Sequence, residues 1–357
     1  MLELPLAPNR FIFFFVVAFL VAAIVARGLS HIAERIGLVD EPGGRKQHEG
    51  RTPITGGIGI YVGFFAATLG SGLVTGPTLA LVVALLLLVA GGAADDMHDI
   101  KPTAKFWMQL IAALFMTSWA GIYVWLLGNL FGFAPIALYN WAIPFSVVCA
   151  LGVINSINML DGLDGAAGGT ALVACLWLAC AAILQKLGIQ ATLLLFLCAA
   201  IAGFLAWNLR LPPFRDQARV FMGDAGSMML GLALCWFSID VTQGTGRTMP
   251  PIVCMWILAV PLLDMVRVMF IRLRRGASMF DADREHLHHF LLERGYSHHA
   301  TAAIVVFVSS LMGGIGVCGW VLGVPEWVLS YAFIVLFLLV LASGYVRERR
   351  ARRENVG

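Results

Sequence analysis

Acidic side chains gather in several places where apolar stretches of this sequence begin or end. In one of them, Asp95, Asp96 and Asp99 directly follow such a stretch in the run D-D-M-H-D. Residues three and four apart share one face of a helix, so we expect the three carboxylates to face one pocket. Like charges beside lipid are costly, so a cation should compensate for them. A simpler interpretation is a solvated helix end paired with Lys101 and Lys105.

A second group of polar side chains lies in the run N-S-I-N-M-L-D-G-L-D-G. Asn155, Asn158 and Asp161 are three residues apart, which places two amides and a carboxylate along nearly one helix face, and Asp164 follows in the turn. A helix C-cap with Asx turns is the alternative. That alternative accounts for one glycine and one polar residue, but not for four polar side chains at this period. We therefore expect this run to contribute to a binding site.

The third acidic motif, F-M-G-D-A-G-S, contains Asp224 at the start of a further apolar segment. An N-cap role alone would explain an aspartate at this position. A carboxylate fixed at a helix start is also well placed to hold a divalent ion. Because hard carboxylate oxygens dominate all three motifs, Mg²⁺ is the metal that the sequence favours, with Mn²⁺ as the open alternative.

Two basic segments supply donors for phosphate oxygens. The run H-L-H-H follows several arginines, and a second run, R-K-Q-H, precedes another apolar stretch. Zinc is an alternative for the histidines, but tetrahedral sites usually take further ligands at fixed offsets. A basic loop at the membrane surface is a second alternative for the histidine run. For R-K-Q-H, ordinary positive-inside charge is an equal alternative to binding an anion. The candidate phosphate-binding residues are Arg45, Lys46, His48, His286, His288 and His289.

The composition indicates the elements that must position these residues. The chain has 357 residues, of which 60% are apolar and 13% charged, against about 45–50% and about 25% in soluble domains. This excludes a cytosolic enzyme, a disordered chain and a nucleic-acid-binding protein. We predict an all-α polytopic membrane protein with about eleven transmembrane helices. They lie near residues 10–29, 54–73, 77–94, 106–127, 141–157, 165–185, 189–208, 225–243, 249–271, 301–322 and 327–346.

The distribution of charge predicts the orientation. With this topology, 21 of the 24 lysines and arginines fall on one side, which the positive-inside rule makes cytoplasmic. The N-terminus is then periplasmic and the C-terminus cytoplasmic. Eighteen of the 21 acidic residues lie on the same side, so we expect an active site on the cytoplasmic face. The seven cysteines fall in or beside the spans and are expected to pack as small apolar residues.

The whole chain, residues 1–357, is expected to be one integral-membrane domain, because its polar connections are too short to form a soluble domain. One membrane face carries carboxylates for a divalent ion, together with amides and cationic donors. This combination suits a phosphorylated substrate. The surrounding lipid suggests that the second substrate is a lipid. A glycosyltransferase could use the same groups. The expected cytoplasmic loops are about 30–53, 95–105, 158–165, 209–224 and 272–300.

Four motifs in this order resemble those of the polyprenyl-phosphate N-acetylhexosamine-1-phosphate transferases: D-D-x-x-D, N-x-x-N-x-x-D-G-L-D-G, F-M-G-D-x-G-S and D-x-E-H-x-H-H. The resemblance covers nearly the whole chain. Within the superfamily the chain is most similar to the bacterial branch that uses undecaprenyl phosphate and UDP-GlcNAc. The resemblance implies transfer of GlcNAc-1-phosphate to the lipid with release of UMP, in a bacterial inner membrane, at the start of O-antigen, enterobacterial common antigen or related polysaccharide synthesis.

The resemblance also assigns roles to individual residues. It implies that Asp224 is the magnesium ligand and that Asp95 or Asp96 activates or positions the lipid phosphate, with Asn158 and Asp161 holding nucleotide or metal. It places the remaining candidates in substrate binding: Asp99, Asn155, Asp164, Arg45, Lys46, His48, Lys105, His286, His288 and His289. The implied partners are a UDP-N-acetylhexosamine, undecaprenyl phosphate and the lipid bilayer; a homodimer is an open arrangement.

Three alternatives stay open at this point. Arg267 is a charge where this branch is expected to have a neutral residue, so the donor could be another UDP-sugar such as UDP-QuiNAc or UDP-FucNAc. Pairing with Asp264, three residues before it, would instead make Arg267 structurally neutral. UDP-MurNAc-pentapeptide is a third donor. A cation-coupled transporter is a more distant alternative, because the acids lie at helix ends and not in the middle of the membrane.

Overall fold

The computed structural model describes residues 5–40, 51–209, 217–276 and 286–354. Within these ranges the chain is mostly helical. The helices are α1 (Pro8–Gly28), α2 (Ser30–Ile36), α3 (Gly56–Gly70), α4 (Pro77–His98), α5 (Pro102–Leu114), α6 (Ala142–Leu160), α7 (Ala166–Leu184), α8 (Gly188–Asn208), α9 (Gly223–Asp240), α10 (Ile252–Ile257), α11 (Ala259–Arg275), α12 (Leu287–Glu293), α13 (His298–Val321) and α14 (Glu326–Glu354). A π-helical turn at Phe115–Trp119 and a 3₁₀ turn at Tyr139–Trp141 complete the helical elements.

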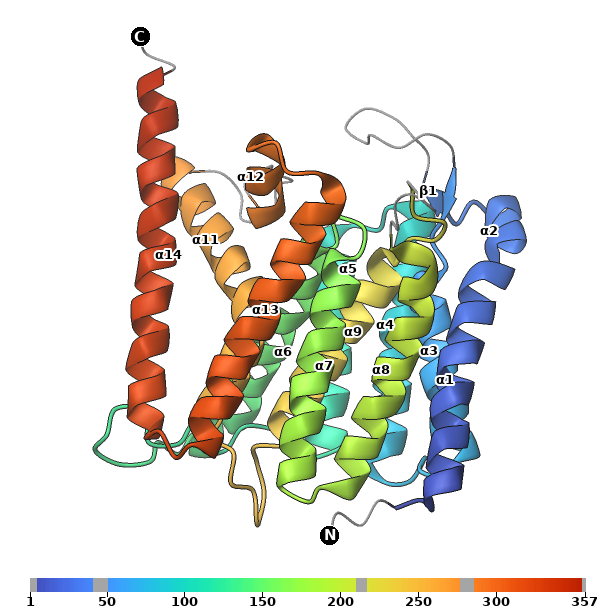
Figure 1. The fold of residues 1–357 in the computed structure, drawn as a ribbon, viewed down its shortest axis with the longest axis horizontal. Helices are drawn as coiled ribbons and strands as arrows, with labels where there is room; N and C mark the ends of the chain where they lie inside the picture. Colours follow the sequence, from blue (N-terminus) through green and yellow to red (C-terminus); the bar gives the residue numbers. More distant parts are fainter. Residues whose placement is uncertain (1–4, 41–50, 210–216, 277–285, 355–357) are drawn as a thin grey trace.

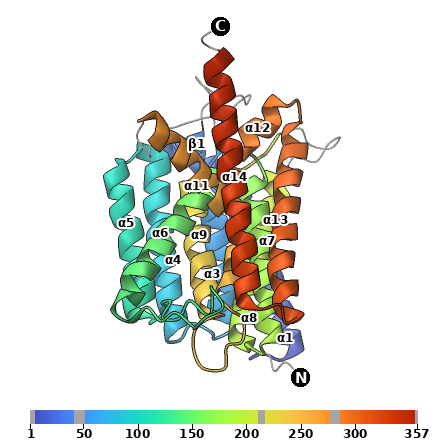
Figure 2. The same ribbon diagram turned by 90° about the vertical axis from the view of Figure 1, so that its left-hand side faces the viewer.

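The long helices stand side by side in one bundle, with α1 beginning at one end and α14 ending at the other (Figure 1). Helix α9 lies at the centre and packs against α4, α6, α3 and α7. From Ala225 to Ile239 every residue of α9 is buried, as expected for a helix that is apolar all round. Helix α14 stands at the edge of the bundle in Figure 1 and faces the viewer in Figure 2, where it lies next to α11. The end of the bundle at which α4 ends and α9 begins is called the site end below.

Seven helices in the described part of the chain are long and apolar enough to cross a membrane: α1, α4, α6 with its preceding turn, α7, α8, α13 and α14 up to Tyr345. The protein is therefore an all-α, multi-pass membrane protein. The other four expected spans correspond to shorter or interrupted helices, among them the 15-residue α3 and the 18-residue α9. The expected number of eleven and the orientation are not confirmed by this count.

Two of the expected spans are interrupted. Expected span 106–127 continues as helix only to Trp119, and an irregular, glycine-containing segment follows. Expected span 249–271 is broken at Leu258 into α10 and α11. Pro261 explains this break, because it has no N–H to donate to the carbonyl of residue 257 and its ring crowds that carbonyl.

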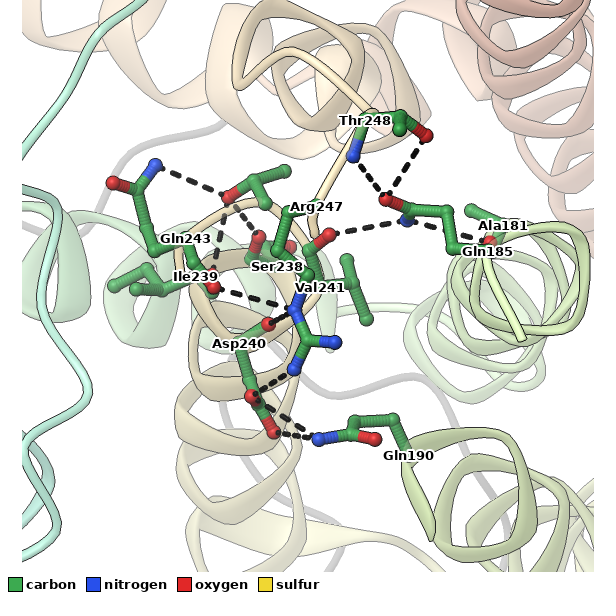
Figure 3. A network of polar contacts seen from close by, with 11 residues as sticks. Ala181, Gln185, Gln190, Ser238, Ile239, Asp240, Val241, Gln243, Arg247 and Thr248 are labelled. Carbon is green, nitrogen blue, oxygen red and sulfur yellow. Dashed lines mark hydrogen bonds and ion pairs between the residues drawn. The ribbon is translucent and has the colours of Figure 1, made fainter. Parts of the chain in front are cut away.

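A polar network joins the helices at the end opposite the site end (Figure 3). Arg247 donates to the backbone carbonyl of Asp240 at 3.0 Å and lies 3.4 Å from its carboxylate, which also accepts from Gln190 at 3.2 Å. Gln185 accepts from the backbone of Thr248 at 2.7 Å. These contacts fasten the connection between α9 and α10 to α7 and α8. They account structurally for two of the few charged residues on this side.

A short hairpin at the site end leads into α3. Strand β1 (Val39–Asp40) pairs antiparallel with β2 (Thr52–Pro53), with Val39 opposite Pro53. The chain after β2 then bonds to the start of α9: the N–H of Phe221 donates to Pro53, and the N–H groups of Gly56 and Gly57 donate to Phe221 and Met222. This small sheet and an isolated antiparallel bridge between Leu126 and Ala137 are the β structure of the described residues.

Glycines allow the backbones of α3 and α9 to pack in direct contact. A Cβ at Gly57 would overlap the backbone nitrogen of Gly226, and a Cβ at Gly226 would lie 2.8 Å from the Cα of Gly57. Gly59 approaches α1 in the same way, at Ala22 and Ala26. Gly57 and Gly59 therefore serve close helix packing.

Gly57→Ala is expected to destabilise the protein by about 1–3 kcal/mol, the usual cost of overpacking. The neighbouring atoms are backbone and cannot rotate away, so α9 and with it Asp224 must shift. Thermal unfolding in detergent measures the loss. Gly152→Ala in α6 is the matched control, because nothing lies within 4 Å of its added Cβ. Equal melting temperatures for the two variants would contradict this packing.

Candidate active site

Four helix termini meet at the site end and bring the acidic motifs together. Asp95 and Asp96 lie in the last turn of α4, Asn158 in the last turn of α6, and Asp224 in the first turn of α9. The first turn of α5 adds Lys105. Residues far apart in the sequence thus form one polar cluster, as the sequence predicted for these positions.

Asp224 is not the N-cap of α9. The helix starts at Gly223 and Met222 occupies the N-cap position. The side chain of this N-cap residue makes no capping hydrogen bond. The carboxylate of Asp96 takes this role from α4: it accepts from the backbone N–H of Asp224 at 3.0 Å and of Ala225 at 3.4 Å. A negative charge is stabilised at a helix N-terminus. Asp96 therefore fixes the start of α9 and leaves the carboxylate of Asp224 available.

Gly223 makes room for this arrangement. Its φ of +70° is a left-handed conformation, which glycine adopts without steric cost. A Cβ at this position would also clash with the side chains of Ile54 and Asp96. The glycine of F-M-G-D is thus required both by the backbone and by the close approach of α4.

Lys105 is the cation that compensates for the acidic cluster. Its Nζ forms an ion pair with Asp95 and lies 2.9 Å from Oδ2 of Asp224. Asp95 is buried and also accepts from the backbone N–H of Ile100 at 2.7 Å. The ammonium group therefore sits between two carboxylates of different helices, where a metal cation would be favoured for the same electrostatic reason.

Two amides of α6 extend the cluster. Asn158 donates to Oδ1 of Asp224 at 2.8 Å and to Ser227 at 2.9 Å. One turn earlier, Asn155 donates to Gln109 of α5 at 2.8 Å. The prediction that these amides lie along one helix face and point to one region is confirmed, and each one bonds to a different helix of the site.

Asp161 ends α6 beside the cluster. Burial raises the pKa of its carboxyl well above its usual range, and the neighbouring charges of Asp224, Asp96 and Asp164 raise it further. The site thus holds more acidic groups than Lys105 neutralises. The loop from Asp161 ends at Gly165, whose N–H donates to Asn208 at 2.8 Å. Asn208 in turn donates to Val220 at 3.0 Å, which ties this loop to the segment before α9.

The histidine run also reaches the site. His288, in α12, is buried and lies against Gly162, where a Cβ would be 2.8 Å from its Nε2. Its Nδ1 is buried without a hydrogen-bond partner among the described residues. Burial and then the charges of His289 and His286 lower the pKa of His288 to about 4, so this ring is neutral at pH 7. The ring centroids of His288 and His289 are 4.2 Å apart.

Asp264 of α11 anchors the start of the histidine run. Its Oδ2 lies 2.9 Å from Nδ1 of His286, and its Oδ1 accepts from the backbone N–H of Leu287 at 2.9 Å. Arg267 donates to the same oxygen at 2.9 Å, and both of these charged side chains are buried. Pairing of Arg267 with Asp264 is therefore confirmed.

Of four further sequence candidates, one lies away from the cluster and three are not described by the structure. Asp99 is exposed, because α4 ends at His98 and the chain turns left-handed at Asp99, with φ of +47°. The expectation that it shares a pocket with Asp95 and Asp96 is wrong for the free protein. The other three lie outside the described residues: Arg45, Lys46 and His48.

Sequence reasoning missed four polar side chains of the site. Gln109 lies four residues after Lys105, on the same face of an apolar helix, and this spacing was the available signal. Ser227 was part of a recognised motif but was not chosen. Asp264 was considered only as the partner of Arg267, and Asn208 is a lone amide at the end of an apolar segment.

The donor set fits a hard divalent cation. The described residues contain no ready-made group of three or more His, Cys, Asp or Glu side chains around a metal position. Carboxylate oxygens of Asp95 and Asp224 nevertheless converge on the ammonium group of Lys105. The carboxylate of Asp96 lies beside them, bonded to the backbone of Asp224, and Asp161 adds a further acid. Oxygen ligands with an excess of negative charge suit magnesium or manganese.

Comparison with known proteins relates the chain to membrane sugar-phosphate transferases. Residues 78–242 match the family model of glycosyl transferase family 4. The chain is 35% identical over 345 residues to undecaprenyl-phosphate alpha-N-acetylglucosaminyl 1-phosphate transferase of Yersinia pestis, covering 96% of this chain and 91% of that protein. For the proteins of the same name from Escherichia coli K12 and Haemophilus influenzae, identity is 33% and 34%; the matches cover 89% and 94% of this chain, and 86% and 98% of those proteins.

Proposed function

The chain belongs to the polyprenyl-phosphate N-acetylhexosamine-1-phosphate transferase superfamily, and from this premise we propose that it transfers GlcNAc-1-phosphate from UDP-GlcNAc to undecaprenyl phosphate. The products are UMP and undecaprenyl-diphosphate-GlcNAc. The enzyme class is that of a phosphotransferase, because the bond that breaks lies between the two phosphates of the donor.

One observation carries this proposal. Asp224 starts a buried helix, its carboxylate is held by Lys105 and Asn158, and its backbone is held by Asp96. An aspartate whose side chain and backbone are together held by three different helices is pre-organised, which is what transfer between two anionic substrates requires. The relatives that align with most of this chain are named after this reaction.

The chemistry asks for alignment more than for a strong base. A phosphate monoester has a second pKa near 6, so the lipid phosphate is largely ionised at pH 7. We therefore propose direct in-line attack of its oxygen on the β-phosphorus of the donor, with the bond to UMP breaking. Asp95 and Asp96 position the groups around this line. A covalent intermediate on an aspartate is the alternative mechanism.

We assign the resident cation as Mg²⁺, with Mn²⁺ as the alternative. Asp224 would hold the ion, with Asp95 or Asp96 beside it. The ammonium group of Lys105, which now lies between the carboxylates of Asp95 and Asp224, would move aside to make room for the ion. When bound, the ion supplies positive charge that stabilises the charge developing on the departing UMP. Asn158 keeps the carboxylate of Asp224 oriented in either state.

The histidine run is proposed to hold the donor phosphates or sugar. His286→Ala and His289→Ala are each expected to lower kcat/KM for UDP-GlcNAc about tenfold, the loss expected for one strong hydrogen bond to a charged group. KM for undecaprenyl phosphate should change little. His299→Ala is the control, because His299 is exposed in the first turn of α13. Unchanged donor kinetics in both variants would refute this role.

We further propose that the site end faces the cytoplasm of a bacterial inner membrane and that about eleven segments cross it. The excess of lysine and arginine at that side supports the orientation. The product would then start O-antigen, enterobacterial common antigen or related cell-envelope polysaccharide synthesis. Labelling of single introduced cysteines from one side of the membrane tests the orientation.

UMP release by the purified protein tests the reaction itself. With undecaprenyl phosphate, UDP-GlcNAc and Mg²⁺ we expect UMP only when both substrates are present, and none after addition of EDTA. Release with another UDP-N-acetylhexosamine but not with UDP-GlcNAc would keep the mechanism and change the donor. No release with any donor, from protein shown to be folded, would overturn the proposal.

A further inference from the structure

A groove between α11, α12, α13 and α14 is not used by the proposed reaction. Its volume is about 690 Å³, within the range of about 300–1,000 Å³ that is usual for ligand pockets. Apolar side chains from all four helices form most of its wall, among them Val260, Leu263, Phe290, Met312 and Leu336.

The polar groups of the groove gather toward the site end. Arg267 lies eight residues after Ala259, about 12 Å further along α11 in the direction of the site end. Arg294, just after α12, joins it, with its guanidinium group 4.1 Å from the ring centre of Phe290. Among the described lining residues Asp264 is the one carboxylate, so the two guanidinium groups outnumber the acidic groups of that described lining.

An apolar trough with a cationic head, in a multi-pass membrane protein, matches the shape and charge of a lipid. We infer that this groove binds one anionic glycerophospholipid, with an acyl chain between α11, α13 and α14 and its phosphate at Arg294. Stacking on Phe290 holds the flat face of the guanidinium group. Its N–H edges are then free to form charge-assisted hydrogen bonds to phosphate oxygens.

The acceptor lipid does not fit this groove as well. Its phosphate must reach the carboxylate cluster, which belongs to α4, α5, α6 and α9, whereas the groove lining comes only from α11 to α14. His286 and His288 stand on the site side of α12, between the groove and Gly162. A phosphate at Arg294 would therefore be separated from the reacting groups.

The groove is nevertheless coupled to the active site through Asp264. This carboxylate lines the groove and also anchors His286 and the backbone of Leu287. A phospholipid that packs against α11 and α12 thus supports the position of the histidine run. If the proposed function holds, donor kinetics in defined lipid should improve when the groove is filled; binding itself does not depend on that function.

Native mass spectrometry of the purified full-length protein, delipidated and titrated with phosphatidylglycerol, tests the inference. Arg294→Ala removes the cationic head and Ala342→Trp fills the groove with a large side chain. Each should weaken phosphatidylglycerol binding about tenfold, the loss of one charge-assisted contact or of the chain's packing. Arg274→Ala on α11 and Ala332→Trp on α14 are controls outside the groove lining, and both should bind as the unaltered chain does.

Equal binding in all four variants would overturn the inference. Displacement of phosphatidylglycerol by undecaprenyl phosphate, or a raised KM for undecaprenyl phosphate in the groove variants, would assign the groove to the acceptor and overturn it. Dissociation of a dimer by Ala342→Trp without loss of lipid would make this face an interface between copies, and would also overturn it. Because the readout is lipid binding, loss of the proposed reaction alone would not affect the result.

Discussion

Asp224→Asn is expected to lower the rate of UMP release about a thousandfold, the scale seen when one group that stabilises transition-state charge is removed. The substitution keeps the size of the side chain and removes its negative charge. The backbone of residue 224 still bonds to Asp96, so α9 should start in the same place. The ion pair with Lys105 is lost, and with it the carboxylate proposed to bind Mg²⁺.

Asp240→Asn is the matched control for this loss of activity. It removes an aspartate from the same helix, at the far end, where Asp240 bonds to Gln190 and Arg247 (Figure 3). Steady-state release of UMP at saturating substrates compares the two. Near-normal activity is expected for Asp240→Asn. Asp224→Asn with more than about a tenth of normal activity would rule out a central role for this carboxylate, since groups of that kind are worth far more.

The sequence was sufficient to locate the candidate active site because its polar residues lie at the ends of apolar segments. A buried helix cannot carry uncompensated charge, so carboxylates at several helix ends had to meet each other or a cation. The structure confirms that Asp95, Asp96, Asn158 and Asp224 meet, together with Lys105. What the motifs did not reveal is that Asp96 bonds to the backbone of α9, because its partner is 128 residues away.

The failures have a common physical cause. Hydropathy reports how readily side chains enter lipid, but it does not report whether the backbone continues as a helix. Asp99 was placed by helical spacing, yet the helix had already ended at His98. The segment after Trp119 is apolar enough to be counted with a span, although glycines at positive φ, such as Gly121, make it irregular. By contrast, Pro261 is a local sequence signal for the helix break at Leu258, between α10 and α11.

Lys105→Met is expected to destabilise the metal-free protein and to strengthen its response to Mg²⁺. Without the ammonium group, Asp95 and Asp224 face each other with no cation between them. Breaking a fully buried pair costs about 3–5 kcal/mol; because the Lys105 side chain is 29% exposed, we expect about 2 kcal/mol. Thermal unfolding in EDTA measures this loss. Lys101→Met is the control, since Lys101 is exposed in the preceding loop.

The sign of the magnesium effect locates the ion. A ligand that binds only the folded state raises its stability with concentration, so the shift in melting temperature reports affinity without any need for activity. If Mg²⁺ binds between the carboxylates that Lys105 now occupies, removing the competing positive charge should tighten its binding by about tenfold. The Mg²⁺-induced shift should then be larger in Lys105→Met than in the unaltered protein, and absent in Asp224→Asn. An equal shift in all three proteins would mean that the ion binds elsewhere, because only a site next to these charges can respond to both substitutions in opposite directions.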